Sequence, residues 1–545
     1  MTMTFDFSPG AQIPLDGTPH TGATAALSSG AYRDNPLEDL VKLNEETAHK
    51  AGRHRVFAPN FGEAFCQAVI ARTLGSSRKP LVRSFGIDPR IVVEHCLEAE
   101  ALRHRRDKQL TAVALIFGFL FLPGTLLWLG AFEFRRRSHP DKQSLFGGLA
   151  LAVCAVIAVL LAWRPPVGGA FGIYLRIVML GAPIGWLVAR QICLRFAIQL
   201  RARWGSLIDG GTVGARVPDA VPIGPEDTKA QTLRKQLTGL ASEQETNYLH
   251  VAHRKGVLGL GRRWAVWQLA EQLDPREGIA EIRPFHPWDV IRKIEDHLGR
   301  MNRSPLATGG FPQLKVEHWA IDSIGEGADE ISRPSGPEFD GSRMRASALT
   351  DLANRQNFGR SGARHYLGVQ FVLFDGGLVL TLLIRVSVLH ETLRIEVSGY
   401  ALGPVAGGFT SKPKPPEKTV TKPGKPWETT TVKTPLVTNQ EVVRLTVRAP
   451  FTWNQSMLNW LGGTFKLPEP FGLRSAWAGP PWGNRNMTDD ATQSALAVLR
   501  AVHSAAVEVL VDHDVDVERF KNRASLLGME VQGTRPSKPD DFDAW

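Results

Sequence analysis

The sequence predicts an α-helical membrane anchor joined to a cytoplasmic α+β domain that contains an antiparallel β-meander. The first observation is a block of apolar runs between residues 110 and 189, in which each run is about as long as a helix that crosses a bilayer. The second is the stretch 365–403, where a turn at 375–377 separates two apolar, β-branched runs and a further strand after 389–392 alternates apolar and polar residues, as in an antiparallel meander with one solvated face.

Length and composition limit the class of protein. A chain of 545 residues has room for two or three domains, and its net charge of +10 is typical of basic flanks around membrane spans. We find no nucleic-acid motif of the kind that interleaves basic and aromatic residues. None of the four cysteines has CxxC spacing and none follows Cys193, so the sequence predicts no cysteine zinc site and favours a reducing compartment.

The N-terminal region lacks the basic and apolar segments of a signal peptide, so we expect it to stay in the cytoplasm. Residues 1–34 are rich in small and polar residues and are predicted to be disordered. Residues 35–108 form a predicted cytoplasmic helical region. Its last helix begins at Asp88-Pro89, a favourable capping pair, and runs into the membrane without a breaker.

The predicted membrane region, 109–203, contains three apolar runs at 110–132, 144–163 and 170–189. The first is interrupted near its centre by Pro123-Gly124. Proline removes a backbone donor and glycine permits a turn, so this pair either reverses the chain as a re-entrant hairpin or kinks a single span.

Basic residues in the flanks favour the hairpin. If the first run turns back, twelve Lys and Arg lie on one side of the membrane and one on the other; if it crosses, the division is eight against five. The positive-inside rule prefers the first arrangement, with both ends of the chain cytoplasmic. The kinked span stays open, because Pro and Gly are common in membrane helices and a turn in lipid needs partners for its backbone.

Arg176 is the one charge inside the third run. It lies close to the end of the run, so we expect its side chain to reach the interface instead of forming a buried relay. The scarcity of polar residues in the runs disfavours a small transporter.

The remaining chain is predicted as a linker (204–225), the α+β domain (226–530) and a disordered tail (531–545). We expect helices at 226–246, at 286–301 and from Thr488 to about Val511, a hairpin turn at 375–377 and a strand at 441–449. The helix at 286–301 has one apolar face, formed by Val290, Ile291, Ile294 and Leu298.

Two segments are candidate lipid contacts. The Lys- and Pro-rich stretch 411–435 is predicted to be an extended, mobile loop that either touches anionic headgroups or is simply solvated. The segment 451–463 is predicted to be a helix, and its aromatic stripe favours core packing over a position on the bilayer surface. The candidate contact residues are Lys412, Lys414, Lys418, Lys422, Lys425, Trp453 and Trp460.

No cofactor, metal or catalytic residue is assigned. The acidic cluster 512–518 lacks the glycine and spacing of an EF-hand, which favours a solvated connector over a metal site. We find no hydrolase, kinase, metalloprotease or nucleotide-binding signature.

Four stretches resemble a family of actinobacterial integral membrane proteins of unknown function: LFLPGTLLWLGAF (120–132), HPWDVIRKIEDHL (286–298), VSVLHETLRIEVSGYALGPV (386–405) and LPEPFGLRSAW (467–477). The resemblance implies an integral membrane protein from about residue 85 onward, and it implies no activity.

The leading hypothesis is therefore a multi-pass protein of the inner membrane that serves as a cytoplasmic scaffold or sensor and binds a protein partner or anionic lipid. The competing hypothesis is a membrane-bound enzyme acting on a lipid-like substrate. The two hypotheses differ in whether Trp453, Trp460, Trp477 and Trp482 line an open pocket or pack in a core. A pocket with convergent His or Asp side chains would favour the enzyme. We expect no nucleic-acid partner.

Overall fold

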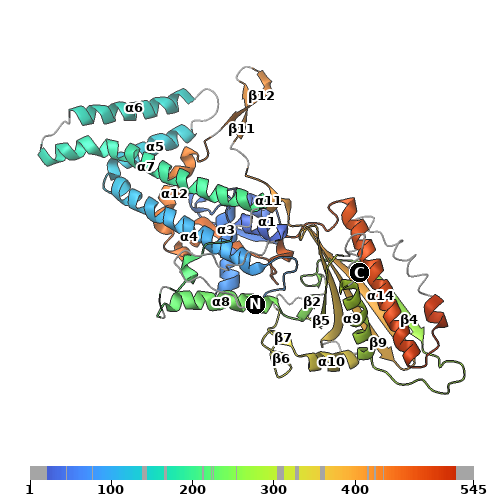
Figure 1. Cartoon of the computed structure of the whole chain (residues 1–545). Coiled ribbons are helices and arrows are strands. Elements are labelled where there is room, and N and C mark those ends of the chain that lie inside the picture. The colour runs from blue at the N-terminus through green and yellow to red at the C-terminus, as the bar shows by residue number, and fades with distance from the viewer. Residues whose placement is uncertain are drawn as a thin grey trace.

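The computed structural model describes residues 21–522 except 45, 76–77, 138–143, 165–168, 211–213, 223, 225, 253–254, 304–311, 326–330, 356–361, 414–416, 423–424 and 434. Three parts follow one another across Figure 1: a bundle of apolar helices, a helical body, and a sheet covered by helices. The predicted tail, 531–545, and residues 1–20 of the predicted disordered segment lie outside the described residues.

The helical body combines the N-terminal region with segments that return from late in the sequence. Its core includes Leu27, Phe65 and Val92 from the N-terminal helices, and Phe409 and Trp477 from the C-terminal half. Its elements are α1 (Gly22–Gly30), α2 (Leu37–Val41), β1 (Ala48–Ala51), η1 (Arg55–Phe57), α3 (Phe61–Leu74), α4 (Pro89–Val113), η3 (Pro218–Ala220), α8 (Thr228–Gln244), α11 (Gly407–Thr410), α12 (Asn439–Arg448), η4 (Ala449–Phe451), α13 (Gln455–Gly462), β13 (Gly463–Lys466) and η5 (Ser475–Trp477).

The structure differs from the predicted disorder of residues 1–34, because residues 22–30 form α1. The Thr21 hydroxyl caps this helix by accepting from the Thr24 amide, and most of its residues are buried. Small residues such as Ala23 and Ala26 suit a helix that packs closely, and composition alone does not separate such a helix from a disordered segment.

The apolar bundle consists of η2 (Ala114–Phe119, a π-helix), α5 (Leu122–Arg137), α6 (Ser144–Trp163) and the N-terminal half of α7 (Gly169–Ile208). The helices α4–η2 and α5 meet at an angle of 100° across a break at residues 120–121. Within the described residues, α7 and α14 (Arg485–Asp512) are long and apolar enough to cross a membrane, and the bent pair would make a third span.

The backbone at the break is satisfied by neighbouring side chains. Thr125 Oγ1 donates to the carbonyls of Phe117 and Phe121, both at 3.1 Å. Tyr174 of α7 donates its hydroxyl to the Leu120 carbonyl at 3.3 Å. These bonds supply partners where the helical ladder is interrupted.

Small residues on α7 make room for the break. A Cβ added at Gly181 would lie 2.6 Å from the Phe121 ring, and one added at Gly185 would lie 2.5 Å from Phe117. The glycines are four residues apart, so they form a groove on one helix face that receives both phenylalanines.

A seven-stranded sheet in the order β3-β2-β5-β8-β9-β10-β4 forms the third part. The pairing of β2 with β5 is parallel and the others are antiparallel, so the sheet is mixed. The strands are β2 (Tyr248–Ala252), β3 (Gly256–Val257), β4 (Arg262–Gln272), β5 (Leu314–Ser323), β8 (Arg364–Leu373), β9 (Leu378–Leu389) and β10 (Thr392–Leu402).

The predicted meander is the centre of this sheet. Strands β8 and β9 meet at the turn through Phe374, Asp375 and Gly376, all at positive φ. One face packs on α9 (Pro287–Arg303) and α14, and the predicted stripe of α9 is buried: Val290, Ile291, Ile294 and Leu298 are each at most 1% exposed. The fold class is thus α+β, as predicted.

The prediction of one solvated sheet face is wrong for the middle of the sheet. Val379 and Leu383 of β9 belong to a second cluster that includes Phe85 from the segment before α4. A Cβ at Gly86 would lie 2.4 Å from Val379, so this segment lies directly on the sheet. The remaining elements are a small hairpin, β6 (Phe339–Asp340) and β7 (Arg343–Met344), and α10 (Ala346–Asn354).

Two further predictions are corrected. Residues 439–448 form helix α12 and not a strand. Val442 and Leu445 are three positions apart, so a helix places them on one face, where they pack against α4 and α7.

The Lys- and Pro-rich stretch contains an antiparallel hairpin, β11 (Glu417–Lys422) with β12 (Lys425–Lys433), in which Val420 pairs with Thr430 and Thr421 pairs with Thr429. Alternating Thr and Val favour this pairing. The hairpin projects away from the body in Figure 1.

Candidate functional site

The candidate site lies where the helical body meets the apolar bundle, and α12 is its central element. The Thr438 hydroxyl caps α12 by accepting from the Glu441 amide. Val442 and Leu445 pack in a cluster with Leu110 of α4 and Ala189 of α7. Helix α12 therefore fills the groove between the helix that enters the bundle and the helix that leaves it.

A buried ion pair holds α12 onto α3. Arg448 is 1% exposed, and its Nη1 lies 2.5 Å from Oε1 of Glu63. Arg448 Nε also donates to the Phe57 carbonyl at 3.1 Å. Burial alone would raise the pKa of Glu63, but Arg448 and then Arg106 outweigh it and bring the pKa to about 2. The carboxylate is therefore charged inside the body.

Helix α13 follows α12 and carries an exposed apolar face. The Asn454 side chain caps it by accepting from the Met457 amide, and Leu458 and Leu461 bury its inner side. Trp453 just before the helix is 66% exposed, Met457 is 42% exposed and Trp460 is 54% exposed. The preference for core packing was therefore wrong, since the leucines and not the tryptophans point inward.

Two basic residues, Arg53 and Lys50, accompany this surface. The Arg53 guanidinium lies 4.3 Å from the centre of the Trp460 ring, a cation–π distance. Lys50 on β1 is exposed and pairs with Thr464 of β13, which directly follows α13. Val56 of η1 is exposed too, and the His54 amide bonds to the Leu461 carbonyl. We call Val56, Trp453, Met457 and Trp460, with Lys50 and Arg53, the α13 face.

A cavity of about 700 Å³ opens beside the α13 face, between α3, α4 and α13. Trp453 lines it together with Glu100, His104 and Lys108 of α4. Burial raises the pKa of Glu100, and His104 opposes that shift. Its lining therefore combines charged side chains with an aromatic wall.

Trp477 and Trp482 lie elsewhere and pack in cores. Trp477 is fully buried in the helical body, where its ring packs at an angle against the rings of Phe65 and Phe409. Trp482 packs against Trp264 in the core of the sheet domain, with ring centres 5.8 Å apart. Trp453 is thus the one that lines the cavity with Glu100 and His104.

The predicted lysine contacts are separate from the α13 face. Lys412 forms an exposed ion pair with Asp209, at 2.7 Å, beyond the C-terminal end of α7. Lys418 and Lys422 lie on β11 and Lys425 lies on β12, whereas Lys414 falls outside the described residues. Among the described residues, the predicted contacts are thus divided between the projecting hairpin, the end of α7 and the α13 face.

The remaining predicted positions lie in the apolar bundle. Pro123 and Gly124 are in the first turn of α5, just after the break, where a missing proline N–H costs no helical bond. Arg176 is exposed near the N-terminal end of α7.

Within the part of the chain that the structure describes, no group of three or more His, Cys, Asp or Glu side chains is arranged to hold a metal ion. In the acidic cluster, Asp514 pairs with Arg283 at 2.6 Å and the His513 ring packs on Phe285.

Several important residues were not singled out from the sequence. Arg448 and Glu63 are far apart in the chain, and nothing local marks them as partners. Gly181 and Gly185 do carry a sequence signal, because two small residues four positions apart in an apolar run are typical of close helix packing.

The structure defines an α+β protein with a bundle of apolar helices and an exposed aromatic-basic face beside it. Residues 266–534 match the model of a family described as the AbeC-like domain. The match covers the greater part of the sheet domain and also α12 and α13. It indicates similarity to a family of uncharacterised type. The apolar bundle lies outside it. No curated protein and no solved structure matches the chain.

Proposed function

We propose that the protein is a membrane-anchored cytoplasmic scaffold or sensor module that rests on an anionic bilayer through the α13 face. The apolar bundle is the anchor in this proposal, and residues 110–132 enter the membrane and turn back. The observation that carries the lipid contact is the exposed group of Trp453, Met457 and Trp460. The preceding helix, α12, packs against α4 and α7.

The turn is supported by the way the break is packed. A turn inside a bilayer requires protein partners for its carbonyls. Thr125 and Tyr174 provide them, and Gly181 and Gly185 admit the phenylalanines on both sides of the break. Together with twelve basic residues in the three flanks of one side, these contacts favour reversal over a simple kink.

The lipid contact is supported by composition and position. Trp and Met on one side of a helix, with Lys and Arg at its edge, are typical of helices that lie in the headgroup region. Each basic residue near an anionic leaflet contributes about 1 kcal/mol. Because α12 is packed between α4 and α7, the anchor would hold the following helix, α13, near the bilayer surface. Little conformational entropy would then be lost when the α13 face binds lipid.

Replacing both Trp453 and Trp460 with alanine is expected to weaken the surface contact by about 2 kcal/mol. Each substitution removes an indole ring of which roughly half would be buried in the interface. The measurement uses a variant free of native cysteines, with Met457→Cys carrying an environment-sensitive fluorophore, reconstituted in vesicles. We expect blue-shifted emission in vesicles that contain phosphatidylserine, and a return toward the aqueous spectrum after the double substitution.

A label at Val511→Cys is the control, because Val511 is also a partly exposed apolar residue (45%) on a helix but lies in the sheet domain. It should report water in every vesicle. An aqueous spectrum at residue 457 in phosphatidylserine vesicles, equal to that at residue 511, would refute the lipid contact.

A further inference from the structure

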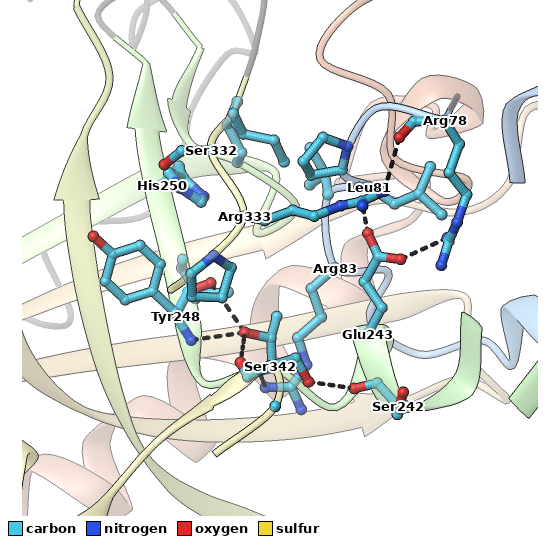
Figure 2. A pocket seen from close by; sticks show the side chains of 18 of the residues that line it. Arg78, Leu81, Arg83, Ser242, Glu243, Tyr248, His250, Ser332, Arg333 and Ser342 are labelled. Atoms are coloured by element: carbon cyan, nitrogen blue, oxygen red, sulfur yellow. Dashed lines mark hydrogen bonds and ion pairs between the residues drawn. The ribbon is translucent and has the colours of Figure 1, made fainter. Parts of the chain in front are cut away.

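A second cavity shares no lining residue with the α13 face and lies between the helical body and the sheet domain. Its volume is about 320 Å³, within the range of small-molecule sites. Its walls come from the segment 78–83, from α8, from strand β2 and from the segment 331–342 (Figure 2). Four stretches distant in sequence therefore build it.

The cavity has an apolar side and a polar side. Leu81, Val82, Leu258 and Ile331 line the apolar side, and all but Leu81 belong to one small buried cluster. Hydroxyl and charged groups line the polar side. Thr246 and Ser342 are already bonded there, Thr246 Oγ1 to the Ser342 carbonyl at 2.6 Å and Ser342 Oγ to the Ser242 carbonyl at 2.7 Å. The polar side is thus preorganised.

Cations outnumber anions among the lining residues, with three arginines against Glu243. Arg78 is paired with Glu243 at 2.5 Å, and Arg83 with Glu317 at 2.8 Å. Arg333 is exposed, and its Nη2 donates to the Arg78 carbonyl at 2.8 Å. Because a carbonyl is neutral, this bond leaves the positive charge of Arg333 uncompensated. A guanidinium has five donors, so Arg333 keeps donors for a ligand.

His250 supplies an unsatisfied polar atom in the wall. The residue is 7% exposed, and its Nε2 is buried with no hydrogen-bond partner in the described part of the chain. The imidazole sits edge-on against Tyr248, with ring centres 5.2 Å apart, and Tyr248 in turn donates to Asp322. Burial lowers the pKa of His250, and Asp322 acts against that shift. Buried polar atoms are rarely left without a partner.

We propose that this cavity binds a short-chain monocarboxylate, with the apolar tail against Leu81 and Ile331, the carboxylate on Arg333, and His250 Nε2 as a buried hydrogen-bond partner. A single unpaired cation suits one negative charge, and the apolar wall excludes a fully hydrated anion. This inference is independent of the lipid contact at the α13 face and assigns a ligand class to the sensor role.

The test is calorimetric titration of the purified full-length protein in detergent with three probes: hexanoate, 1-hexanol and inorganic phosphate. We expect hexanoate to bind with a Kd of about 1 mM or tighter, and the other two to bind at least about tenfold more weakly. Arg333→Gln and His250→Gln should each weaken hexanoate binding by about tenfold or more, because each removes a partner of the ligand.

Arg345→Gln is the matched control, because Arg345 is an exposed arginine close to the same segment and does not line the cavity. It should leave hexanoate binding unchanged. Equal binding of hexanoate and hexanol, stronger binding of phosphate, or hexanoate binding that survives both Arg333→Gln and His250→Gln would each overturn the proposal. Circular dichroism shows whether each variant has folded. Arg333 is exposed, so Arg333→Gln should fold even if His250→Gln does not, and its effect on hexanoate binding then decides the test.

Discussion

Replacing Arg448 with methionine is expected to lower the free energy of unfolding by about 3 kcal/mol, because it leaves the Glu63 carboxylate buried without its main partner. The loss falls at the lower end of the range for broken buried pairs, since Arg106 and Arg103 still attract the carboxylate. Thermal unfolding in detergent, followed by circular dichroism, measures the change.

The Arg485→Met variant is the matched control. Arg485 is 3.8 Å from Asp489, but its side chain is 86% exposed, so its loss should cost less than about 0.5 kcal/mol. Adding Glu63→Leu to Arg448→Met should recover most of the lost stability, because an apolar pair removes the unpaired charge. An Arg448→Met variant as stable as Arg485→Met would show that the pair does not fasten α12 to α3.

Replacing Gly181 with valine is expected to destabilise the apolar bundle by about 1–3 kcal/mol, because the new Cβ would lie 2.6 Å from the Phe121 ring at the break. Phe121 would have to leave the groove on α7. The same thermal unfolding measurement reports the change.

Gly130→Val tests for a general effect of valine in these helices. Gly130 is also in an apolar helix, and a Cβ there would meet nothing within 4 Å. Adding Phe121→Ala should make the Gly181→Val change less costly than in the parent chain, since it removes the clashing ring. Equal losses for Gly181→Val and Gly130→Val would mean that the break is not packed against α7 as described.

The sequence was sufficient where local chemistry and periodicity agreed. The charge-free run 144–163 is a helix with these bounds, and the stripe from Val290 to Leu298 is buried. The Asp375-Gly376 turn joins two strands as expected. In each case the signal lies within a few neighbouring residues and no distant contact overrides it.

Prediction failed where tertiary contacts decided between two readings of one pattern. In 441–449, apolar residues recur both every second and every third position. The groove between α4 and α7 selected the helix that buries Val442 and Leu445 and leaves Val447 38% exposed. The Lys- and Pro-rich stretch was predicted to be an extended loop because of its composition. The Thr and Val residues within it instead form a paired hairpin.

The candidate site shows the same division. A helix was predicted over 451–463, and the structure has one at Gln455–Gly462. Which of its apolar residues point inward depends on where α12 lies, and the sequence does not reveal that. The cavity around His250 joins four distant segments, so no local motif announces it. Sites assembled by topology require the fold before their residues can be grouped.

The most direct test of the account is cysteine accessibility in intact membranes. Single cysteines are introduced at Asn60, His139, Val167 and Arg300 in a version without native cysteines, and a membrane-impermeant reagent is applied from each side. We expect residues 60, 139 and 300 to react from the cytoplasmic side and residue 167 to react from the opposite side. Reaction of residue 139 on the same side as residue 167 would contradict the turn at residues 120–124 and, with it, the proposed anchor.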